Sequence, residues 1–143
     1  PREKNPEEKK RIQKSLVSAL EERKNGIAGT ALIAMNSLRR QSGFERCEVA
    51  EAAHTLMTAK DSAEDVKITA LQIGAELNDG RFLPIAKDAL QNTKSTIMKM
   101  SALSAIGMLG GPEDVALIEK YLLSSDVRLR PVAKAALKNM SGR

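Results

Sequence analysis

Two neighbouring segments, VKITALQIGAELNDGRFLPIAKDALQ (residues 66–91) and MKMSALSAIGMLGGPEDVALIEKYLL (residues 98–123), carry one pattern shifted by about 32 residues. Apolar positions coincide under this shift, and so do the helix breakers, because Asn78-Asp79-Gly80 falls on Gly110-Gly111-Pro112. An interval of this length is typical of arrays of helical hairpins, which bury their apolar faces by stacking on one another. The duplication therefore predicts two consecutive hairpins, over residues 62–92 and 95–124.

The flanking segments follow the same pattern less closely. Residues 27–60 are interpreted as a first, degenerate hairpin whose connector is about five residues longer than in the later copies. Its apolar positions Ile27, Ala31, Met35 and Leu38 match Met98, Ala102, Ile106 and Leu109. Residues 6–24 predict a leading helix that ends at Asn25-Gly26, and residues 126–140 predict a closing helix.

We therefore expect an all-α fold of eight helices: about three hairpins stacked as a right-handed superhelix, or solenoid, with one flanking helix at each end. A single domain would span residues 1–143, and we expect it to be one piece of a larger protein. Pro131 falls inside the predicted closing helix, where it should remove a backbone hydrogen bond and bend the axis. The apolar stripe of that helix runs from Leu129 to Met140 and needs a cover, from the preceding hairpin, more chain or a partner.

The composition agrees with closely packed helices. Hydrophobic residues make up 42% of the chain, whereas aromatic residues make up 2% and tryptophan is absent. Aliphatic side chains and methionine must fill the interior, which suits helices better than a sandwich or barrel rich in aromatic and β-branched strands. The net charge is +5, and most of the excess lies in residues 1–24. A strong electrostatic signal for nucleic-acid binding would need a larger clustered excess.

The chain contains one cysteine, Cys47, so it can form neither an intramolecular disulfide nor a cysteine-based metal cage. No apolar run approaches the roughly 20 residues of a membrane span, and the charged N-terminal region lacks the apolar core of a signal peptide. These features favour a reducing, cytoplasmic compartment without membrane insertion.

The most regular copy places its characteristic residues in a fixed order: Met98-Lys99, Ala102, Ala105-Ile106-Gly107, Leu109-Gly110, Pro112 and Val115. This order resembles HEAT-like helical repeats of the short, PBS-lyase type, which are related to armadillo repeats. Residues 61–140 follow the pattern well and residues 27–58 follow it loosely. The resemblance implies an α–α superhelix that acts as a protein-interaction scaffold, while a minority of such families bind nucleic acid or handle pigments and small ligands.

Residues with catalytic or metal-binding chemistry are sparse. His54 is the only histidine, and beside Ala53 and Leu56 on a predicted helix its packing role outweighs that of a general base or metal ligand. Cys47, at a predicted helix start, is better interpreted as a small apolar residue than as an activated thiol. Gly110-Gly111-Pro112 lacks the Lys-Ser/Thr of a phosphate-binding loop and follows a helix, so it acts as a helix breaker. We expect no catalysis, no cofactor and no bound metal.

Nucleic-acid binding is the main alternative function. The basic residues that would carry it are Lys9, Lys10, Arg11 and Lys14 of the first helix, with Arg39, Arg40, Arg46, Arg128 and Arg130. These residues would have to converge on one face, whereas acidic residues interleave throughout and aromatic side chains for base stacking are nearly absent. A HEAT-like lyase or small-ligand protein is a further alternative, which a large apolar pocket with convergent polar groups would favour.

We predict instead that the chain binds another protein, or a further part of its own chain, through the second helices of its hairpins. In stacked hairpins these helices usually line the concave surface. The repeat alignment predicts two solvent-facing rows there, Ala53, Lys87 and Glu119 in one and His54, Asp88 and Lys120 in the other. Their mixed charge suits a polar protein surface. The predicted partner-binding residues are His54, Lys87, Asp88, Glu119 and Lys120.

Overall fold

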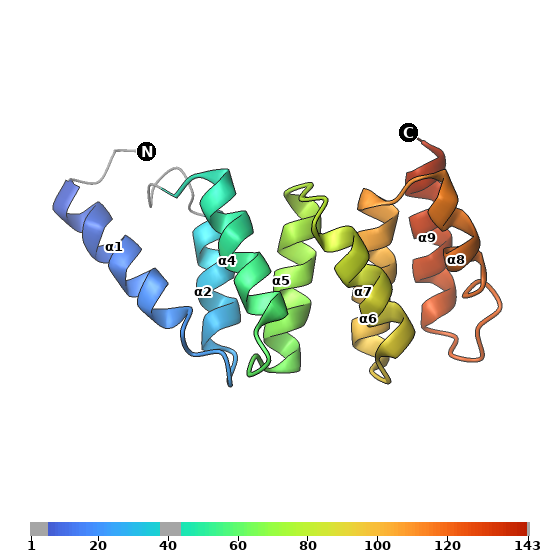
Figure 1. Cartoon of the computed structure of the whole chain (residues 1–143), viewed down its shortest axis with the longest axis horizontal. Helices are drawn as coiled ribbons and strands as arrows, with labels where there is room; N and C mark the ends of the chain where they lie inside the picture. Colours follow the sequence, from blue (N-terminus) through green and yellow to red (C-terminus); the bar gives the residue numbers. More distant parts are fainter. Residues whose placement is uncertain (1–5, 38–43, 143) are drawn as a thin grey trace. The chain divides into compact units, whose positions relative to one another are not determined.

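The computed structural model describes residues 6–37 and 44–142, which form helices and connecting turns without a strand. These ranges hold eight α-helices, as the sequence predicts, and one short 3-10 helix, η1. The elements are α1 Pro6–Ala19, α2 Ile27–Ser37, α4 Arg46–Thr58, α5 Glu64–Glu76, α6 Phe82–Asn92, α7 Thr96–Leu109, η1 Pro112–Asp114, α8 Val115–Glu119 and α9 Leu129–Ser141 (Figure 1). The all-α prediction is confirmed, and the superhelical arrangement stays a prediction.

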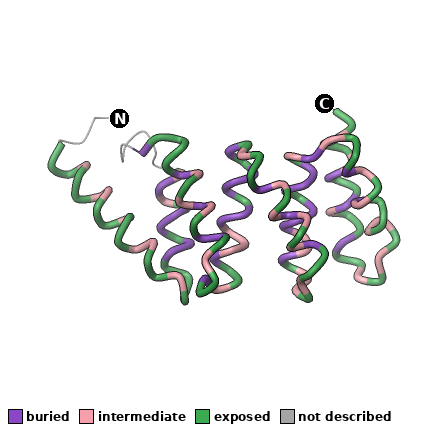
Figure 2. The backbone as a smooth tube through the Cα atoms, viewed as in Figure 1, coloured by how far each residue is buried: buried purple, intermediate pink, exposed green. Residues whose placement is uncertain are grey.

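Two compact units divide the chain between Ile73 and Gly74, near the end of α5. The first unit contains α1, α2, α4 and most of α5, and the second contains the end of α5 with α6, α7, η1, α8 and α9. Figure 2 shows buried residues along α2 and α7, whereas α1 has none. The single domain over residues 1–143 stays a prediction.

In the first unit, α2 and the start of α5 meet at small side chains. α2 is rich in alanine and aliphatic residues, and its Leu32 and Met35 are almost completely buried. Gly29 faces Thr69 and Val66 of α5, and a Cβ added there would make ordinary van der Waals contact with them. In Figure 1, α1 approaches α2 at their connecting turn and diverges from it toward its own N-terminal end.

The leading helix is shorter than predicted, because α1 ends at Ala19 and not at residue 24. Tertiary contacts hold the turn at residues 20–23 in a different geometry. The carbonyl of Arg23 accepts a hydrogen bond from the backbone N–H of Ala63, 2.7 Å away. The Arg23 guanidinium donates two hydrogen bonds to the Asp61 carboxylate, at 2.9 and 3.1 Å. These bonds tie the turn after α1 to the turn before α5, and no local pattern predicts them.

In the second unit, α7 lies at the centre of the core and packs against both α6 and α9. Ser95 caps α7 as the sequence predicts, because its hydroxyl accepts a hydrogen bond from the backbone N–H of Met98. α7 and α9 meet closely at Gly107, where an added Cβ would lie 2.8 Å from the Cα of Ala136. A side chain there would push the two helices apart, so the small residues set their spacing.

The sequence duplication is visible in the pattern of burial. α5 and α7 begin 32 residues apart, at Glu64 and Thr96. The core positions of α5 (Val66, Ala70, Leu71 and Ile73) are buried, and so are the corresponding positions of α7 (Met98, Ala102, Leu103 and Ala105). Residues that the sequence repeat aligns therefore occupy corresponding positions in the core.

At one contact the two copies exchange a large and a small side chain. In the earlier copy the ring of the fully buried Phe82 lies beside Gly74, 2.4 Å from where a Cβ would stand. The corresponding residues in the later copy are Ile106 and Asp114, both buried. Isoleucine stands where glycine was, and aspartate stands where the ring was. Asp114 instead accepts a hydrogen bond from Gly111 and pairs with Lys87, so the position has a different role in the later copy.

The closing helix begins later than predicted. α9 spans Leu129–Ser141, so Pro131 lies in its first turn and not in its interior. Backbone N–H groups of a first turn have no intrahelical acceptor, and proline therefore removes no helical hydrogen bond there. The predicted loss of a hydrogen bond is wrong, and with it the reason for a bend. Asp126 sets the later start, because its carboxylate accepts from the N–H of Arg128 and its carbonyl accepts from the N–H of Leu129, each at 3.0 Å.

A polar joint links the starts of α7 and α9. The Thr96 hydroxyl donates to the Asp126 carboxylate over 2.8 Å, and the Arg128 guanidinium donates to both residues. The hydrogen bonds from Arg128 and Thr96 lower the pKa of Asp126 to about 2. Asp126 is therefore ionised in the folded protein down to strongly acidic pH.

We predict that Phe82→Ala lowers the free energy of unfolding by about 3–5 kcal/mol, because it empties a fully buried site. Gly74→Ala alone should also destabilise the fold, because its Cβ would collide with the Phe82 ring. The same Gly74→Ala change should cost less in the Phe82→Ala background. Urea unfolding of the three variants measures this coupling, with the exposed Leu123→Ala as a control that stays within about 0.5 kcal/mol of the parent. Strictly additive effects would contradict the proposed contact.

Acidification tests the polar joint. The folded-state pKa of Asp126, about 2, lies below the unfolded value of about 3.9. Its ionised form therefore stabilises the fold above pH 4, and this contribution is lost as the pH falls from about 4 through 2. We predict that Asp126→Asn loses less stability than the parent between pH 5 and pH 2, as measured by urea unfolding at each pH. Parallel curves for the two proteins would show that the joint contributes nothing.

Candidate interaction groove

An open, mainly apolar groove of about 570 Å³ lies in the second unit, between the start of the α8 segment and the C-terminal half of α9. Val115, Leu122, Leu137 and Met140 form its apolar wall, and the Gly110-Gly111-Pro112 turn closes one side. Glu119 is the one residue with a charged side chain among those that line it. The groove thus combines an apolar surface with a single carboxylate.

The groove exposes part of the apolar stripe of the closing helix, which runs from Leu129 to Met140. The sequence predicts that this stripe needs a cover. Leu129 and Ala133, in the first half of α9, are buried against the rest of the second unit. Leu137 and Met140, in the second half, are only half-buried and line the groove. The preceding hairpin therefore covers the stripe incompletely.

The short second helix of the last hairpin accounts for the opening. The sequence predicts a helix from Pro112 to about Leu123, but η1 takes the first residues and α8 ends at Glu119. Leu122 then lies in a turn and is half-buried, whereas the corresponding Leu90 of the longer α6 is 1% exposed. Leu122 thereby lines the groove together with Leu137 and Met140 of α9.

Beside the groove, Asp114 connects two hairpins. It is buried, and its carboxylate accepts a hydrogen bond from the backbone N–H of Gly111 at 3.0 Å and forms an ion pair with Lys87 of α6. Burial raises the pKa of this carboxyl, but the hydrogen bonds from Lys87 and Gly111 outweigh that effect and hold the pKa below its ordinary value. Asp114 is therefore a charged residue that fixes the start of the α8 segment against α6.

The predicted partner-binding residues lie in different settings. Lys87 is partly buried by its ion pair with Asp114, and Asp88, beside it on α6, is exposed and accepts a hydrogen bond from the Asn92 side chain. Glu119 and Lys120 are exposed at the end of α8, and Glu119 lines the groove.

In the first unit, His54 is half-buried on α4, where its carbonyl accepts a hydrogen bond from the Thr58 hydroxyl. The expectation that Ala53 faces solvent is wrong, because Ala53 is completely buried. Its methyl group lies in the core of α4 beside Leu56 and Met57, which are also buried. The first of the two predicted rows therefore lacks its first member, and whether the remaining residues form one surface stays a prediction.

Residues that the sequence reasoning missed include Leu137 and Met140, although their signal was present in the stripe of the closing helix. How far the preceding hairpin covers them depends on packing between helices, which the 32-residue repeat does not describe.

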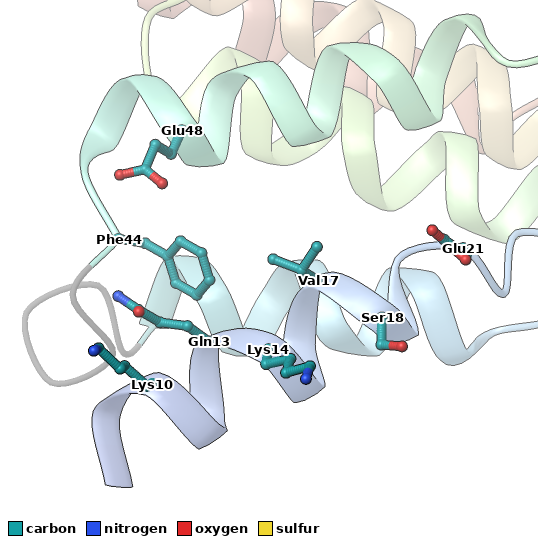
Figure 3. A pocket seen from close by; sticks show the side chains of 8 residues that line it. All are labelled: Lys10, Gln13, Lys14, Val17, Ser18, Glu21, Phe44 and Glu48. Carbon is teal, nitrogen blue, oxygen red and sulfur yellow. The ribbon is translucent and has the colours of Figure 1, made fainter. Parts of the chain in front are cut away.

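The basic residues that would carry nucleic-acid binding lie in several different places. Arg39 and Arg40 lie outside the described residues, and Arg46 is exposed in the first turn of α4. A second groove, of about 530 Å³, has Lys10 and Lys14 of α1 on its wall together with the acidic residues Glu21 and Glu48, around Val17 and Phe44 (Figure 3). Charges of both signs line it, whereas a phosphate backbone requires a consistently positive surface.

The residues with possible metal-binding or thiol chemistry can be located in the part of the chain that the structure describes. No group of three or more His, Cys, Asp or Glu side chains there could hold a metal ion. Cys47 is exposed in the first turn of α4, at a helix start as the sequence predicts. Within residues 6–37 and 44–142, no helix combines the length and apolar character that a membrane span needs. Comparison with protein-family models, with curated proteins and with solved structures found no match.

The Lys87–Asp114 ion pair beside the groove predicts that substitutions at two corresponding positions change the free energy of unfolding by different amounts. Lys87→Met leaves the buried Asp114 carboxylate without its cationic partner, and we expect the free energy of unfolding to fall by about 1–3 kcal/mol. Glu119→Gln, at the corresponding exposed position 32 residues later, should change it by less than about 0.5 kcal/mol. Urea unfolding at pH 7 compares the two. Equal effects would mean that the Lys87 ion pair does not stabilise the fold.

Proposed function

We propose that this chain is a non-catalytic protein-interaction module of HEAT-like helical repeats stacked as a superhelix, and that it binds a helical segment in the α8–α9 groove. The observation that carries the proposal is the incompletely covered stripe of α9, where Leu137 and Met140 remain half-exposed in a groove of about 570 Å³. Helix-in-groove recognition uses such apolar surfaces, which receive side chains spaced by one helical turn.

The charge of the groove defines the complementary segment. In the preceding copy Lys87 pairs with Asp114 at the start of the following helix segment. The corresponding residue of the next copy is Glu119, whose charge is opposite and which forms no ion pair within the described part of the chain. A segment that takes the equivalent place beside α8 and α9 should therefore offer Glu119 a lysine or an arginine. The proposed ligand is an amphipathic helix with an apolar face and a basic residue in its first turns.

A pair of synthetic peptides tests the proposal. Each is an amphipathic helix of about 16 residues with leucines at positions i, i+4 and i+8, and they differ only in carrying either arginine or glutamate in the second turn. The arginine peptide should bind more tightly by on the order of tenfold, as measured by fluorescence anisotropy, because an opposite charge meets Glu119. Met140→Glu should weaken both peptides, because it places a charge in the apolar wall. Glu119→Arg should reverse the preference.

The control variant is Asn139→Glu, which alters an exposed residue of α9 outside the groove and should leave peptide binding unchanged. If neither peptide binds, or if both bind Met140→Glu as tightly as the parent, the groove is not a helix-binding site.

A further inference from the structure

The turn between α1 and α2 contains the Asn-Gly pair of this chain, Asn25-Gly26. Both residues are exposed, and they lie between the end of α1 and the start of α2. The side-chain oxygen of Asn25 accepts a hydrogen bond from the backbone N–H of Ile27 at 3.0 Å. The backbone N–H of Gly26 has no hydrogen-bond acceptor within residues 6–37 and 44–142. An accessible side-chain amide therefore precedes an accessible peptide nitrogen.

This arrangement meets the requirements of spontaneous deamidation. The peptide nitrogen after an asparagine attacks the side-chain carbonyl carbon, its proton passes through solvent to the side-chain nitrogen, and ammonia leaves. The product is a cyclic succinimide, which water opens at either carbonyl to give aspartate or isoaspartate. Water is the one co-reactant, and no electrons are gained or lost. Glycine favours the attack because no side chain crowds its nitrogen and its backbone rotates freely.

Asparagines in two other turns have neighbours whose nitrogen is already engaged. The N–H of Asp79, which follows Asn78, donates to the Gly74 carbonyl at 3.1 Å. The N–H of Thr93, which follows Asn92, donates to a carbonyl of α6 at 3.0 Å. Each of these nitrogens would have to lose its hydrogen bond before it could attack.

The remaining asparagines are excluded by their positions. Asn36 and Asn139 lie inside α2 and α9, so the nitrogen that follows each of them belongs to a helix. Asn5 precedes Pro6, whose nitrogen carries no proton to give up. The sequence and the structure together single out Asn25.

The turn also borders an apolar groove of about 740 Å³ between α1 and α2. Leu16 of α1 and Ile27 and Ala31 of α2 line this groove, and so does Asn25. Among the described residues, no charged side chain lines it. A carboxylate at position 25 would therefore bring a negative charge to a neutral, mainly apolar surface.

We infer that Asn25-Gly26 is a site of spontaneous deamidation, and that its modification changes the α1–α2 groove from a neutral surface to an anionic one. The inference goes beyond the proposed function, because it concerns a different groove in the first unit. Aspartate at position 25 keeps an oxygen for the Ile27 N–H, as an Asx turn requires. Its negative charge also lies near the N-terminus of α2, where the helix dipole favours it.

Isoaspartate alters the turn itself, because its main chain runs through the former side chain and is longer by a methylene group. The N–H of Ala28 donates to the carbonyl of Glu22 at 3.2 Å, and this hydrogen bond spans position 25. The longer main chain should loosen it. Hydrogen exchange at Ala28 therefore distinguishes isoaspartate from aspartate.

Peptide mapping by mass spectrometry tests the site. The folded chain is aged at pH 8 until a synthetic peptide of residues 22–30, aged beside it, is fully deamidated. Both aspartate and isoaspartate should then appear at Asn25 in the chain, as distinguished by electron-transfer fragmentation. Asn78 and Asn92 serve as internal controls and should remain unmodified.

Two variants test the chemistry. In Gly26→Ala the nearest atom to the added Cβ is a carboxylate oxygen of Asp65 at 3.4 Å, so the variant should fold. Its side chain crowds the attacking nitrogen, and deamidation at Asn25 should slow severalfold. Asn25→Ser keeps a side-chain oxygen for the turn but cannot cyclise, so it should remain unmodified. Hydrogen exchange at Ala28 should quicken in the isoaspartate form of the parent and not in Asn25→Asp.

Methyl NMR spectra of Asn25→Asp test the effect on the groove. The methyl signals of Ile27 and Leu16, which line the groove, should shift relative to the parent. The signals of Ile33, which is 50% exposed on the same helix but does not line the groove, should stay in place.

An Asn25 that is intact in the folded chain when the synthetic peptide is fully deamidated would overturn the inference. Equal modification of Asn25 and Asn78 would overturn it as well, because the hydrogen bonds of the two turns would then not decide the site. Unshifted Ile27 and Leu16 signals in Asn25→Asp would contradict the change of the groove.

Discussion

A helical hairpin of about thirty residues cannot bury its apolar face alone, and this constraint shapes the whole chain. Each helix must find part of its core on a neighbouring hairpin, so the distance between neighbouring helices has to be short and constant. The contact of Gly107 with Ala136 meets this need between α7 and α9. Where one copy has Gly74 beside the Phe82 ring, the other has the buried residues Ile106 and Asp114, so the corresponding positions are filled differently.

Polar side chains then fix the positions at which successive helical segments begin, which close packing alone does not determine. Asp61 binds Arg23 before α5, Asp126 binds Thr96 and Arg128 before α9, and Asp114 binds Lys87 before α8. In each case a carboxylate at the start of one helical segment reaches a residue of an earlier one. A carboxylate in a turn accepts several hydrogen bonds at once, which suits a junction between hairpins. Their pKa values lie below the ordinary range for the same reason, so the junctions lose charge only in acid.

The same constraint explains the two apolar grooves. Where packing between neighbouring helices is incomplete, apolar side chains stay partly open, as Leu137 and Met140 do on α9 and as Leu16 and Ile27 do around the α1–α2 turn. Because the α8–α9 groove presents apolar side chains of a helix face, we propose another helix as its ligand.

The amino-acid sequence alone determined the fold class, the number of helices in the described residues and the core positions of the repeated copies. Apolar spacing, breakers such as Gly110-Gly111-Pro112 and the Ser95 cap act over a few residues, so they can be identified without knowing the neighbours. Only the tertiary structure decided where α1 and α8 end, that Pro131 lies in a first turn, that Ala53 is buried and that Lys87 is paired with Asp114. Each of these depends on a contact between residues far apart in the chain. The groove belongs to this second group, because a hydrophobic stripe shows that a helix needs a cover, whereas only the packed structure shows which part of the stripe has none.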